Sequence, residues 1–399
     1  MSLLAAVAGL LDGREGALVP VPSGDLRETE LLTTSLRVGE EIDDEVALVV
    51  STSGTTGTPK GAMLTSTALI ASASATHDRL GGPGRWLLAL PAHHIAGMQV
   101  LVRSVLAGTV PVGMDLSDGF DVDELPRAVS ELGSGRRYTS LVANQLAKAL
   151  AVPAAAAALT ELDAVLLGGG PAPRPVLDAA AEAGVTVVST YGSSETAGGC
   201  VYDGLPLDGV EIRIDGTDPA GCGRIVIGGA TLARGYRNPP EPDPFAEPGW
   251  FRTDDVGAFD ASGRLTVLGR ADDAISTGGL TVMPSVVEAA LARHPAVAEC
   301  AVFGVADDRL GQRVIAAVVA AAPSCPPTAG EIRDFVGESL GRTAAPREVV
   351  FVAELPRRGI GKIDYRALRE MYGGALREMH GGALPETYRG ALPERYRAP

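Results

Sequence analysis

The sequence contains one run of hydroxyl residues and glycines with a lysine near its end, Ser51-Thr-Ser-Gly-Thr-Thr-Gly-Thr-Pro-Lys60-Gly61. It follows an apolar stretch that predicts a buried strand, and it precedes a segment with helical spacing at 64–80. Such a loop offers backbone N–H groups, hydroxyls and one cation to a polyphosphate. It departs from the Walker pattern, because Pro59 stands where the second glycine belongs. On composition alone, a flexible Ser/Thr/Gly loop stays open as an alternative.

Three further segments place polar groups beside predicted strand ends or turns. Ser189–Thr196 brings an aromatic ring, hydroxyls and the Glu195 carboxylate to one strand end, where the ring suits a base and the carboxylate suits magnesium. Trp250–Asp255 and Gly269–Asp273 place acids and a guanidinium beside turns, which suits the hydroxyls of a ribose. Each segment alone is equally typical of a solvated turn.

A single lysine, Lys362, stands on a glycine-flanked segment near the end, within Pro356–Asp364. A loop of this kind can carry its cation into a distant site. Taken singly, it is also typical of a solvated basic loop.

The elements that must position these groups follow an alternating pattern. Apolar runs at 46–54, 86–94, 162–170 and 185–195 predict buried strands, and Ala-rich helical segments between them predict an α/β fold with a mostly parallel sheet flanked by helices. From about residue 205, shorter strands separated by Gly, Pro and Asp predict an antiparallel subdomain. After Arg270, two strand and two helix patterns predict a small α+β domain.

Composition excludes several functional classes. The net charge of -15 disfavours nucleic-acid binding, and no free stretch of eighteen apolar residues predicts a membrane span. The four cysteines lack C-x-x-C spacing and the histidines lack a zinc pattern. The first apolar run lacks the basic start of a cleaved signal, so we expect a cytoplasmic protein.

Together and in this order, the five segments that carry these groups resemble the adenylate-forming superfamily of acyl-CoA synthetases, firefly luciferases and peptide-synthetase adenylation domains. The resemblance covers residues from about 45 to about 370. It implies an enzyme that uses ATP and Mg²⁺ to activate a carboxylic acid as its acyl-adenylate and then transfers the acyl group to coenzyme A. It also implies a large ATP- and acyl-binding domain at 1–269 and a small mobile domain with the catalytic lysine at 270–370. Residues 371–399 lie outside the resemblance, and we expect them to form a flexible repeat tail.

The resemblance assigns roles residue by residue. It implies that the phosphates contact Ser51, Thr52, Ser53, Gly54, Thr55, Thr56, Gly57, Lys60 and Ser194. It implies that Gly168, Gly169, Gly170, Pro171, Tyr191 and Gly192 frame adenine, that Asp255 and Arg270 contact ribose, and that Glu195 binds magnesium. It further implies that Asp272 is the hinge, that Gly278 and Gly279 line the path of the thiol, and that Lys362 bridges the substrate carboxylate and the α-phosphate.

The chain departs from the superfamily pattern in three places. Thr253-Asp254-Asp255 stands where T-G-D is usual, and Asp364-Tyr365 stands where a basic residue commonly follows the lysine motif. About 45 residues precede the phosphate loop, fewer than is usual, which implies a compact acyl site and a small substrate.

Two segments bear on the acid. Pro91-Ala-His-His94-Ile-Ala-Gly97 and Thr139–Leu146 look most like the o-succinylbenzoate-CoA ligases of menaquinone biosynthesis. That substrate has a second carboxylate, for which His94, Ser193 and Arg174 are the expected donors, with His94 also a catalytic candidate. Alternatives stay open: a ligase for another small aryl or short-chain acid, an adenylation domain serving a carrier protein, a non-catalytic nucleotide-binding homologue, and a structural role for His94.

The end of the chain repeats with a period of eight residues from Met371, in units too short and rich in Gly and Pro to pack alone. We expect a solvated extension whose removal after Arg369 leaves turnover intact, with an interaction segment as the alternative. A homodimer is the default expectation for the assembly.

Overall fold

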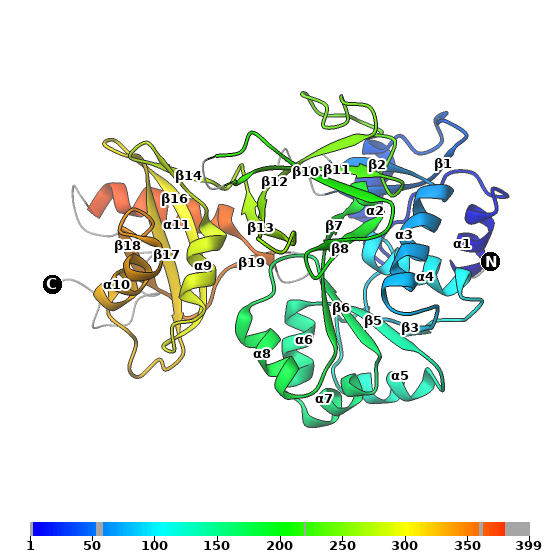
Figure 1. Cartoon of the computed structure of the whole chain (residues 1–399), viewed down its shortest axis with the longest axis horizontal. Coiled ribbons are helices and arrows are strands. Elements are labelled where there is room, and N and C mark those ends of the chain that lie inside the picture. Colours follow the sequence, from blue (N-terminus) through cyan, green and yellow to red (C-terminus); the bar gives the residue numbers. More distant parts are fainter. Residues whose placement is uncertain (1–2, 53–58, 219–220, 359–361, 380–399) are drawn as a thin grey trace. The chain divides into compact units, whose positions relative to one another are not determined.

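The computed structural model describes residues 3–52, 59–218, 221–358 and 362–379. The chain forms two compact units, each described by itself below (Figure 1). Unit 1 comprises Met1–Ala172, Val176–Thr253 and Ala258–Thr266, and unit 2 comprises Pro173–Pro175, Asp254–Gly257 and Val267–Pro399. The domain boundaries expected at 269 and 370 stay predictions. Among the described residues, no helix is long and apolar enough to cross a membrane.

The main sheet of unit 1 confirms the predicted α/β class. Its strand order is β4-β3-β5-β6-β7-β8-β9, and the pairings from β4 to β7 are parallel while those from β7 to β9 are antiparallel. The strands are β3 (Arg85–Leu88), β4 (Val112–Gly113), β5 (Arg137–Val142), β6 (Ala164–Gly168), β7 (Val187–Ser193), β8 (Gly198–Tyr202) and β9 (Leu205–Pro206).

Helices cover both faces of this sheet, as parallel strands require (Figure 1). Successive residues of β6 show the alternation: Val165 and Leu167 join one core cluster, and Ala164 and Leu166 join another with Trp86. The first cluster includes residues of α5 (Leu125–Glu131), α6 (Ala143–Leu150), α7 (Pro153–Thr160) and α8 (Arg174–Glu182), and the second includes residues of α3 (Ser66–Arg79) and α4 (Ile95–Leu106).

The strands on either side of the phosphate loop pair with each other, which corrects the expected strand-loop-helix order. Strand β1 (Val46–Thr52) pairs antiparallel with β2 (Lys60–Thr65), and α3 begins only after β2, with Thr65 accepting a hydrogen bond from the amide of Ala68. The expectation was wrong because β2 is itself a core strand, whose Ala62 and Leu64 are fully buried.

The N-terminal segment outside the superfamily resemblance belongs to the core of unit 1. Val7 and Leu10 of α1 (Leu3–Leu11) pack in one cluster with Leu69 of α3 and Leu101 of α4. Helix α2 (Leu26–Ser35) buries Leu32 in a second cluster that includes residues of β1. The short N-terminus therefore carries packing that the motifs did not indicate.

The antiparallel subdomain is also confirmed. Its strand order is β10-β11-β12-β13, formed by β10 (Val210–Asp215), β11 (Gly223–Gly229), β12 (Trp250–Phe259) and β13 (Leu265–Arg270). The segment Trp250–Asp255 follows a turn at 248–249, as expected, and its residues begin the ten-residue strand β12. Arg270 ends β13 and a turn follows it, as expected.

Unit 2 has the α+β composition that was predicted. Its five-stranded sheet has the order β15-β14-β17-β16, with β18 parallel to β17. The elements are β14 (Ile275–Thr277), β15 (Leu280–Val282), α9 (Pro284–Leu291), β16 (Val297–Asp307), β17 (Gly311–Ala320), α10 (Ala329–Leu340), β18 (Glu348–Phe351), β19 (Arg357–Arg358), β20 (Lys362–Ile363) and α11 (Tyr365–Met379).

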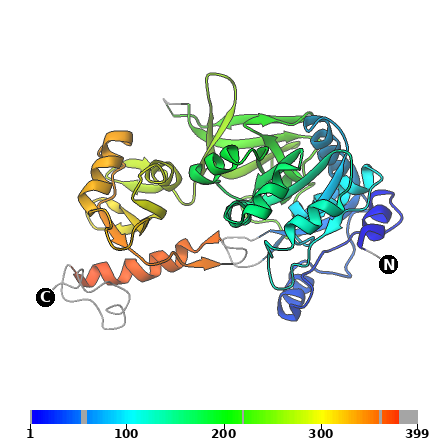
Figure 2. The same cartoon turned by 90° about the horizontal axis from the view of Figure 1, so that it is seen from below.

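The last helix extends further than the sequence suggested. Figure 2 shows the orange β19–β20 hairpin leading directly into the red helix α11. The helix continues to Met379, so residues 371–379, expected to begin the tail, are helical. Residues 380–399 lie outside the described part of the chain.

Candidate functional site

The two ends of the phosphate loop are held together by the hairpin and by a distant asparagine. Ser51 pairs with Gly61, and Thr52 pairs with Lys60. Asn238 bridges the outgoing end, because its Oδ1 accepts from the Gly61 amide at 3.0 Å and its Nδ2 donates to the Pro59 carbonyl at 2.7 Å. Residues 53–58, which include the predicted Ser53, Gly54, Thr55, Thr56 and Gly57, lie outside the described residues.

Lys60 and Glu195, predicted from separate motifs, meet at one tyrosine. The Tyr236 hydroxyl donates to Glu195 Oε1 at 2.5 Å, and Lys60 Nζ lies 5.3 Å from the centroid of the same ring. Glu195 is buried in the short 3-10 helix Ser194–Thr196. A cation for phosphate and a carboxylate for a divalent metal are therefore neighbours through Tyr236.

The sequence did not identify Tyr236, and the backbone explains how it arrives there. Ala62 and Tyr236 form an antiparallel bridge, the Arg237 amide donates to the Gly61 carbonyl at 2.7 Å, and the Ala233 amide donates to the Glu195 carbonyl at 2.8 Å. The segment therefore lies beside β2 although more than 170 residues separate them in the chain. Its only local signal is an aromatic residue after Gly235 in a segment without strand periodicity.

The backbone after Glu195 is fixed by buried side chains. Ala197 adopts a left-handed conformation with φ of 51°, and its carbonyl accepts from Ser72 Oγ at 3.0 Å and from Gln99 Nε2 at 2.8 Å. Thr196 Oγ1 accepts from the Ser193 amide at 2.9 Å and donates to the Gly198 carbonyl at 2.7 Å. These bonds pre-organise the Glu195 carboxylate.

The predicted adenine frame occupies adjacent strand ends. Gly168 ends β6, Tyr191 lies near the end of β7, and the two strands pair in parallel with Leu167 opposite Ser189. A side chain at Gly168 is excluded, because its Cβ would lie 2.5 Å from Thr190 Oγ1. The next glycines have positive φ values, 81° at Gly169 and 158° at Gly170, and Gly192 leaves no room for a Cβ beside the Gly198 carbonyl. Ligands of open parallel sheets bind at this kind of edge.

Of the two segments that suggested the acid, the second bonds to the residues just before the first. His94 is the N-cap residue of α4, and its ring lies 4.3 Å from that of His93 between centroids. Gln145, from the second segment, donates through Nε2 to the Ala89 carbonyl at 2.9 Å. Thr139 Oγ1 likewise donates to the Leu87 carbonyl at 3.1 Å. Burial lowers the pKa of His93, so this imidazole is uncharged at neutral pH.

The other expected acyl donors differ in their surroundings. Ser193 Oγ is buried without a hydrogen-bond partner among the described residues, which suits contact with a ligand. Arg174 is exposed at the start of α8. The substrate roles of His94, Ser193 and Arg174 stay predictions.

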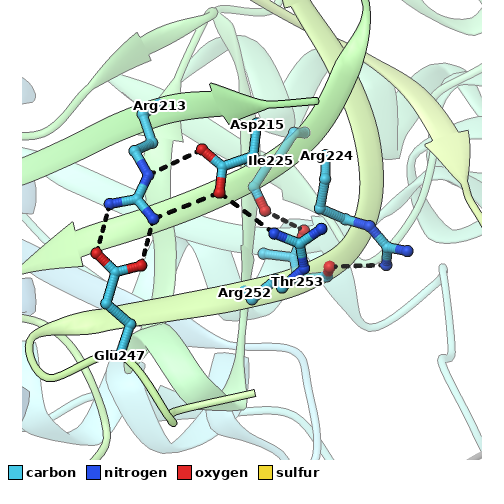
Figure 3. A network of polar contacts seen from close by, with 7 residues as sticks. All are labelled: Arg213, Asp215, Arg224, Ile225, Glu247, Arg252 and Thr253. Carbon is cyan, nitrogen blue, oxygen red and sulfur yellow. Dashed lines mark hydrogen bonds and ion pairs between the residues drawn. The ribbon is translucent and has the colours of Figure 1, made fainter. Parts of the chain in front are cut away.

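The residues before Asp254 and Asp255 are tied into the antiparallel subdomain. Thr253 donates through Oγ1 to the Ile225 carbonyl at 2.8 Å and accepts at its own carbonyl from Arg224 Nη1 at 2.9 Å (Figure 3). The same view shows a charged network that joins β10 to β12, formed by Arg213, Asp215, Glu247 and Arg252. This network fixes the strand from which the expected ribose ligand projects.

In unit 2, the expected ribose residue Arg270 contacts the expected hinge residue Asp272. Arg270 Nε lies 2.9 Å from Asp272 Oδ1 and Nη2 lies 2.8 Å from Oδ2, while Nη2 lies 3.3 Å from Asp254 Oδ2. Burial opposes the charge of this guanidinium, but the hydrogen bond to Asp272 and the charges of Asp272, Asp255 and Asp254 prevail and raise the pKa of Arg270. A change of backbone at Asp272 therefore changes the partners of Arg270.

The remaining predicted residues of unit 2 lie on two hairpins. Gly278 and Gly279 form the two-residue turn between β14 and β15, with φ values of 59° and 81° that only glycine adopts readily. Lys362 begins β20 and pairs with Arg358 of β19. Its side chain lies outside the described atoms, as do residues 359–361.

Among the described residues, no group of three or more His, Cys, Asp or Glu side chains is arranged to hold a metal ion by itself. One carboxylate beside the phosphate loop is compatible with a magnesium ion, because Mg²⁺ is commonly bound by one or two carboxylates together with substrate phosphates and water. Glu195 supplies one such carboxylate beside the phosphate loop.

Comparison with known proteins places this site in a family. Residues 16–237 match the AMP-binding enzyme family, and residues 286–362 match the AMP-binding enzyme C-terminal domain. The match begins well before residue 45, in agreement with the packed N-terminal segment.

Two relatives and one solved structure are informative. A probable 2-succinylbenzoate--CoA ligase of Mycobacterium tuberculosis (strain ATCC 25618 / H37Rv) is 67% identical, over 93% of this chain and 95% of that protein. The 2-succinylbenzoate--CoA ligase of Geobacillus kaustophilus (strain HTA426) is 36% identical over 92% of this chain and 76% of that protein. The o-succinylbenzoate CoA synthetase of Bacillus subtilis, solved with its acyl-adenylate intermediate, superposes with a TM-score of 0.71 at 30% identity, over 92% of this chain and 80% of that one. The chain therefore belongs to the AMP-binding enzyme family, the adenylate-forming ligases that its motifs predicted.

Proposed function

We propose that this protein joins o-succinylbenzoate (2-succinylbenzoate) to coenzyme A at the expense of ATP, releasing AMP and pyrophosphate. The reaction has two steps, formation of an acyl-adenylate and transfer of its acyl group to the thiol. The product, o-succinylbenzoyl-CoA, is an intermediate of menaquinone biosynthesis.

The observation that carries the proposal is the meeting of Lys60 and Glu195 at Tyr236, beside the ends of the phosphate loop. A cation and a buried carboxylate at that place suit a polyphosphate with its magnesium ion. The acid is proposed from the relatives, whose names specify 2-succinylbenzoate, and from the Thr139 segment, whose side chains bond to Leu87 and Ala89 just before Pro91.

In the first step, a carboxylate oxygen of the acid attacks the α-phosphorus, and the bond from that phosphorus to the pyrophosphate oxygen breaks. Lys60 and the loop from Ser51 to Gly57, with Ser194, hold the leaving phosphates, and Glu195 would hold a magnesium ion. When bound, that ion would neutralise charge on the phosphates. Lys362 stabilises the charge that develops between the two reacting anions.

The nucleoside is held by two sets of residues, one for the adenine and one for the ribose. Gly168 to Gly170, Tyr191 and Gly192 frame the adenine, and Asp255 and Arg270 contact the ribose hydroxyls. Arg270 is suited to this role because its guanidinium is charged and already oriented by two carboxylates.

In the second step, the coenzyme A sulfur attacks the acyl carbonyl carbon, AMP leaves with the bonding electrons, and the thiol proton passes to solvent. Rotation near Asp272 changes the face that unit 2 presents, and Gly278-Gly279 lines the path of the thiol. The second carboxylate of the acid, the one that does not react, accepts hydrogen bonds from His94, Ser193 and Arg174.

The test is AMP formation by the purified full chain with ATP, magnesium and coenzyme A, across o-succinylbenzoate, benzoate, salicylate, acetate and a medium-chain fatty acid. We expect o-succinylbenzoate to give the highest kcat/KM. A higher kcat/KM for another acid would support the reaction class and contradict the proposed substrate. If no acid gives AMP, a non-catalytic nucleotide-binding protein is favoured.

A further inference from the structure

The lysine hairpin of unit 2 is tied to the domain core by a carboxylate that the reaction itself does not use. Glu288 of α9 is a partly buried acid whose Oε1 accepts from the Tyr365 hydroxyl at 2.8 Å and from the Val302 amide at 2.7 Å. Tyr365 is the first residue of α11, three residues after Lys362. Three residues span at most about 10 Å, so this contact restricts the backbone position of Lys362.

The same helix is held at its next turn. Arg369 lies four residues after Tyr365, on the same face of α11, and its Nη2 is 2.8 Å from Asp273 Oδ1. Asp364 caps the helix, because its Oδ1 accepts from the amides of Arg366 and Ala367, and its own amide donates to the Pro356 carbonyl at 2.8 Å. The chain on both sides of the β19–β20 hairpin is therefore fixed.

This arrangement explains a departure that the sequence left without a role. Tyr365 stands where the superfamily commonly has a basic residue after the lysine motif. A basic side chain there could form an ion pair with Glu288, whereas the phenol donates one neutral hydrogen bond to the same partly buried oxygen. Either side chain can therefore bond to Glu288, with different chemistry.

We propose that Glu288 and Tyr365 are positioning residues for Lys362, and that their hydrogen bond serves the adenylation half-reaction but not the thioester half-reaction. The proposal rests on the proposed function, because it assumes that Lys362 acts between carboxylate and α-phosphate. A lysine that neutralises developing charge must be placed accurately, whereas transfer from a finished adenylate does not use it.

Both half-reactions can be measured separately on the full chain. Pyrophosphate release in the absence of coenzyme A reports adenylation, and thioester formation from supplied acyl-adenylate and coenzyme A reports transfer. We expect Tyr365→Phe to slow adenylation about tenfold while transfer stays within about twofold of wild type. Glu288→Gln keeps an acceptor oxygen and should lose less than Tyr365→Phe.

Tyr372→Phe is the matched control, because it removes a hydroxyl from the same helix where the ring packs against Phe303 with centroids 6.1 Å apart. We expect it to leave both half-reactions unchanged. Equal losses in both half-reactions for Tyr365→Phe would show a merely structural role, and no loss in either would show that the contact does not position the lysine; each outcome overturns the proposal.

The acid in this experiment is the best substrate of the wild type, whichever acid that is. Failure of o-succinylbenzoate alone therefore discards the proposed substrate and leaves the positioning test intact. A wild type that activates no acid overturns both proposals.

Discussion

At the scale of single residues, Tyr236 is the group whose role the structure changes most. Its ring makes a cation–π contact with Lys60, and its hydroxyl donates a hydrogen bond to Glu195. Tyr236 therefore orients a cation and a carboxylate at once. The motifs that contain Lys60 and Glu195 give no sign of Tyr236 in the sequence. The contact depends on pairing between β2 and a segment far along the chain.

Removing the Tyr236 hydroxyl tests this orientation. We expect Tyr236→Phe to lower the adenylation rate about tenfold and to raise the magnesium concentration needed for half-maximal rate, because Glu195 loses its buried donor. The measurement is pyrophosphate release against magnesium concentration. Tyr202→Phe is the control, since that buried hydroxyl bonds to Thr76 instead. A normal magnesium dependence in Tyr236→Phe would contradict the assigned orientation.

Glu288 predicts a pH-dependent stability. Burial raises the pKa of this carboxyl from 4.5 to about 7, with Asp273 adding to the effect and the bonds from Val302 and Tyr365 opposing it. The neighbouring thiol of Cys300 also has a pKa raised by burial, to about 12, and so stays protonated in this range. Because the folded state binds the Glu288 proton more tightly than the unfolded state, this stabilisation is complete below about pH 4.5 and is lost as the pH rises to about 7.

Glu288→Gln removes that titration. Relative to wild type, the variant should gain stability between about pH 5 and about pH 8, by at most about 3 kcal/mol. Urea unfolding at both pH values measures the difference. Glu348→Gln, which removes a carboxylate paired with Arg313 at 3.3 Å in the same unit, is the control. The same pH dependence in wild type and Glu288→Gln would refute the shifted titration.

At the scale of elements, the hairpin β1–β2 is the scaffold of the phosphate loop, and Gly61 is its tightest point. A Cβ there would lie 2.5 Å from Val49 Cγ1 and 2.8 Å from Leu36 Cδ2. We expect Gly61→Ala to destabilise the protein by about 1–3 kcal/mol, measured as a lower urea midpoint. Gly113→Ala in β4, where a Cβ meets nothing within 4 Å, should be nearly neutral. Equal midpoints for the two variants would argue against close packing at Gly61.

The elements also show what sequence patterns can predict. Strong periodicity and apolar runs identified α3, β6, β7, β10, β11, α9 and α10, because the pattern of buried residues in each is visible in its own sequence. Helix α11 was not predicted. Strand β2 was missed because it is short, with the sequence Lys60-Gly-Ala-Met-Leu-Thr, and its last residues were assigned to the helix that follows. Asp254 and Asp255 were expected beside a turn, and pairing with neighbouring strands places them inside β12.

The residues of the candidate site also differ in how far the sequence could predict them. Residues in a local motif, such as Glu195 and Lys60, could be named as candidates from the sequence, because glycine, hydroxyl and charged residues stand together there. Tyr236 and Asn238 were missed, and so was the Glu288–Tyr365 contact, because all of them act through pairing between distant segments. The roles of His94, Ser193 and Arg174 stay predictions for the acid panel.

At the scale of the whole molecule, the extent of α11 changes where the chain can be shortened. The sequence suggested that truncation after Arg369 is harmless, but Tyr372 lies beyond that point and packs against Phe303. We expect truncation after Met379 to leave kcat and the thermal unfolding midpoint unchanged, and truncation after Arg369 to lower the midpoint. Loss of turnover on removing only residues 380–399 would instead support an interaction or catalytic role for the repeats.

The central claim concerns the whole chain, and a competition experiment tests it most directly. The full-length protein is incubated with ATP, magnesium, coenzyme A and an equimolar mixture of o-succinylbenzoate, benzoate and salicylate, and the thioesters are identified by mass spectrometry. Product ratios in such a mixture report the ratios of kcat/KM. We predict o-succinylbenzoyl-CoA as the dominant thioester, formed in a one-to-one ratio with AMP; a dominant thioester of another acid, or AMP without any thioester, would contradict the account.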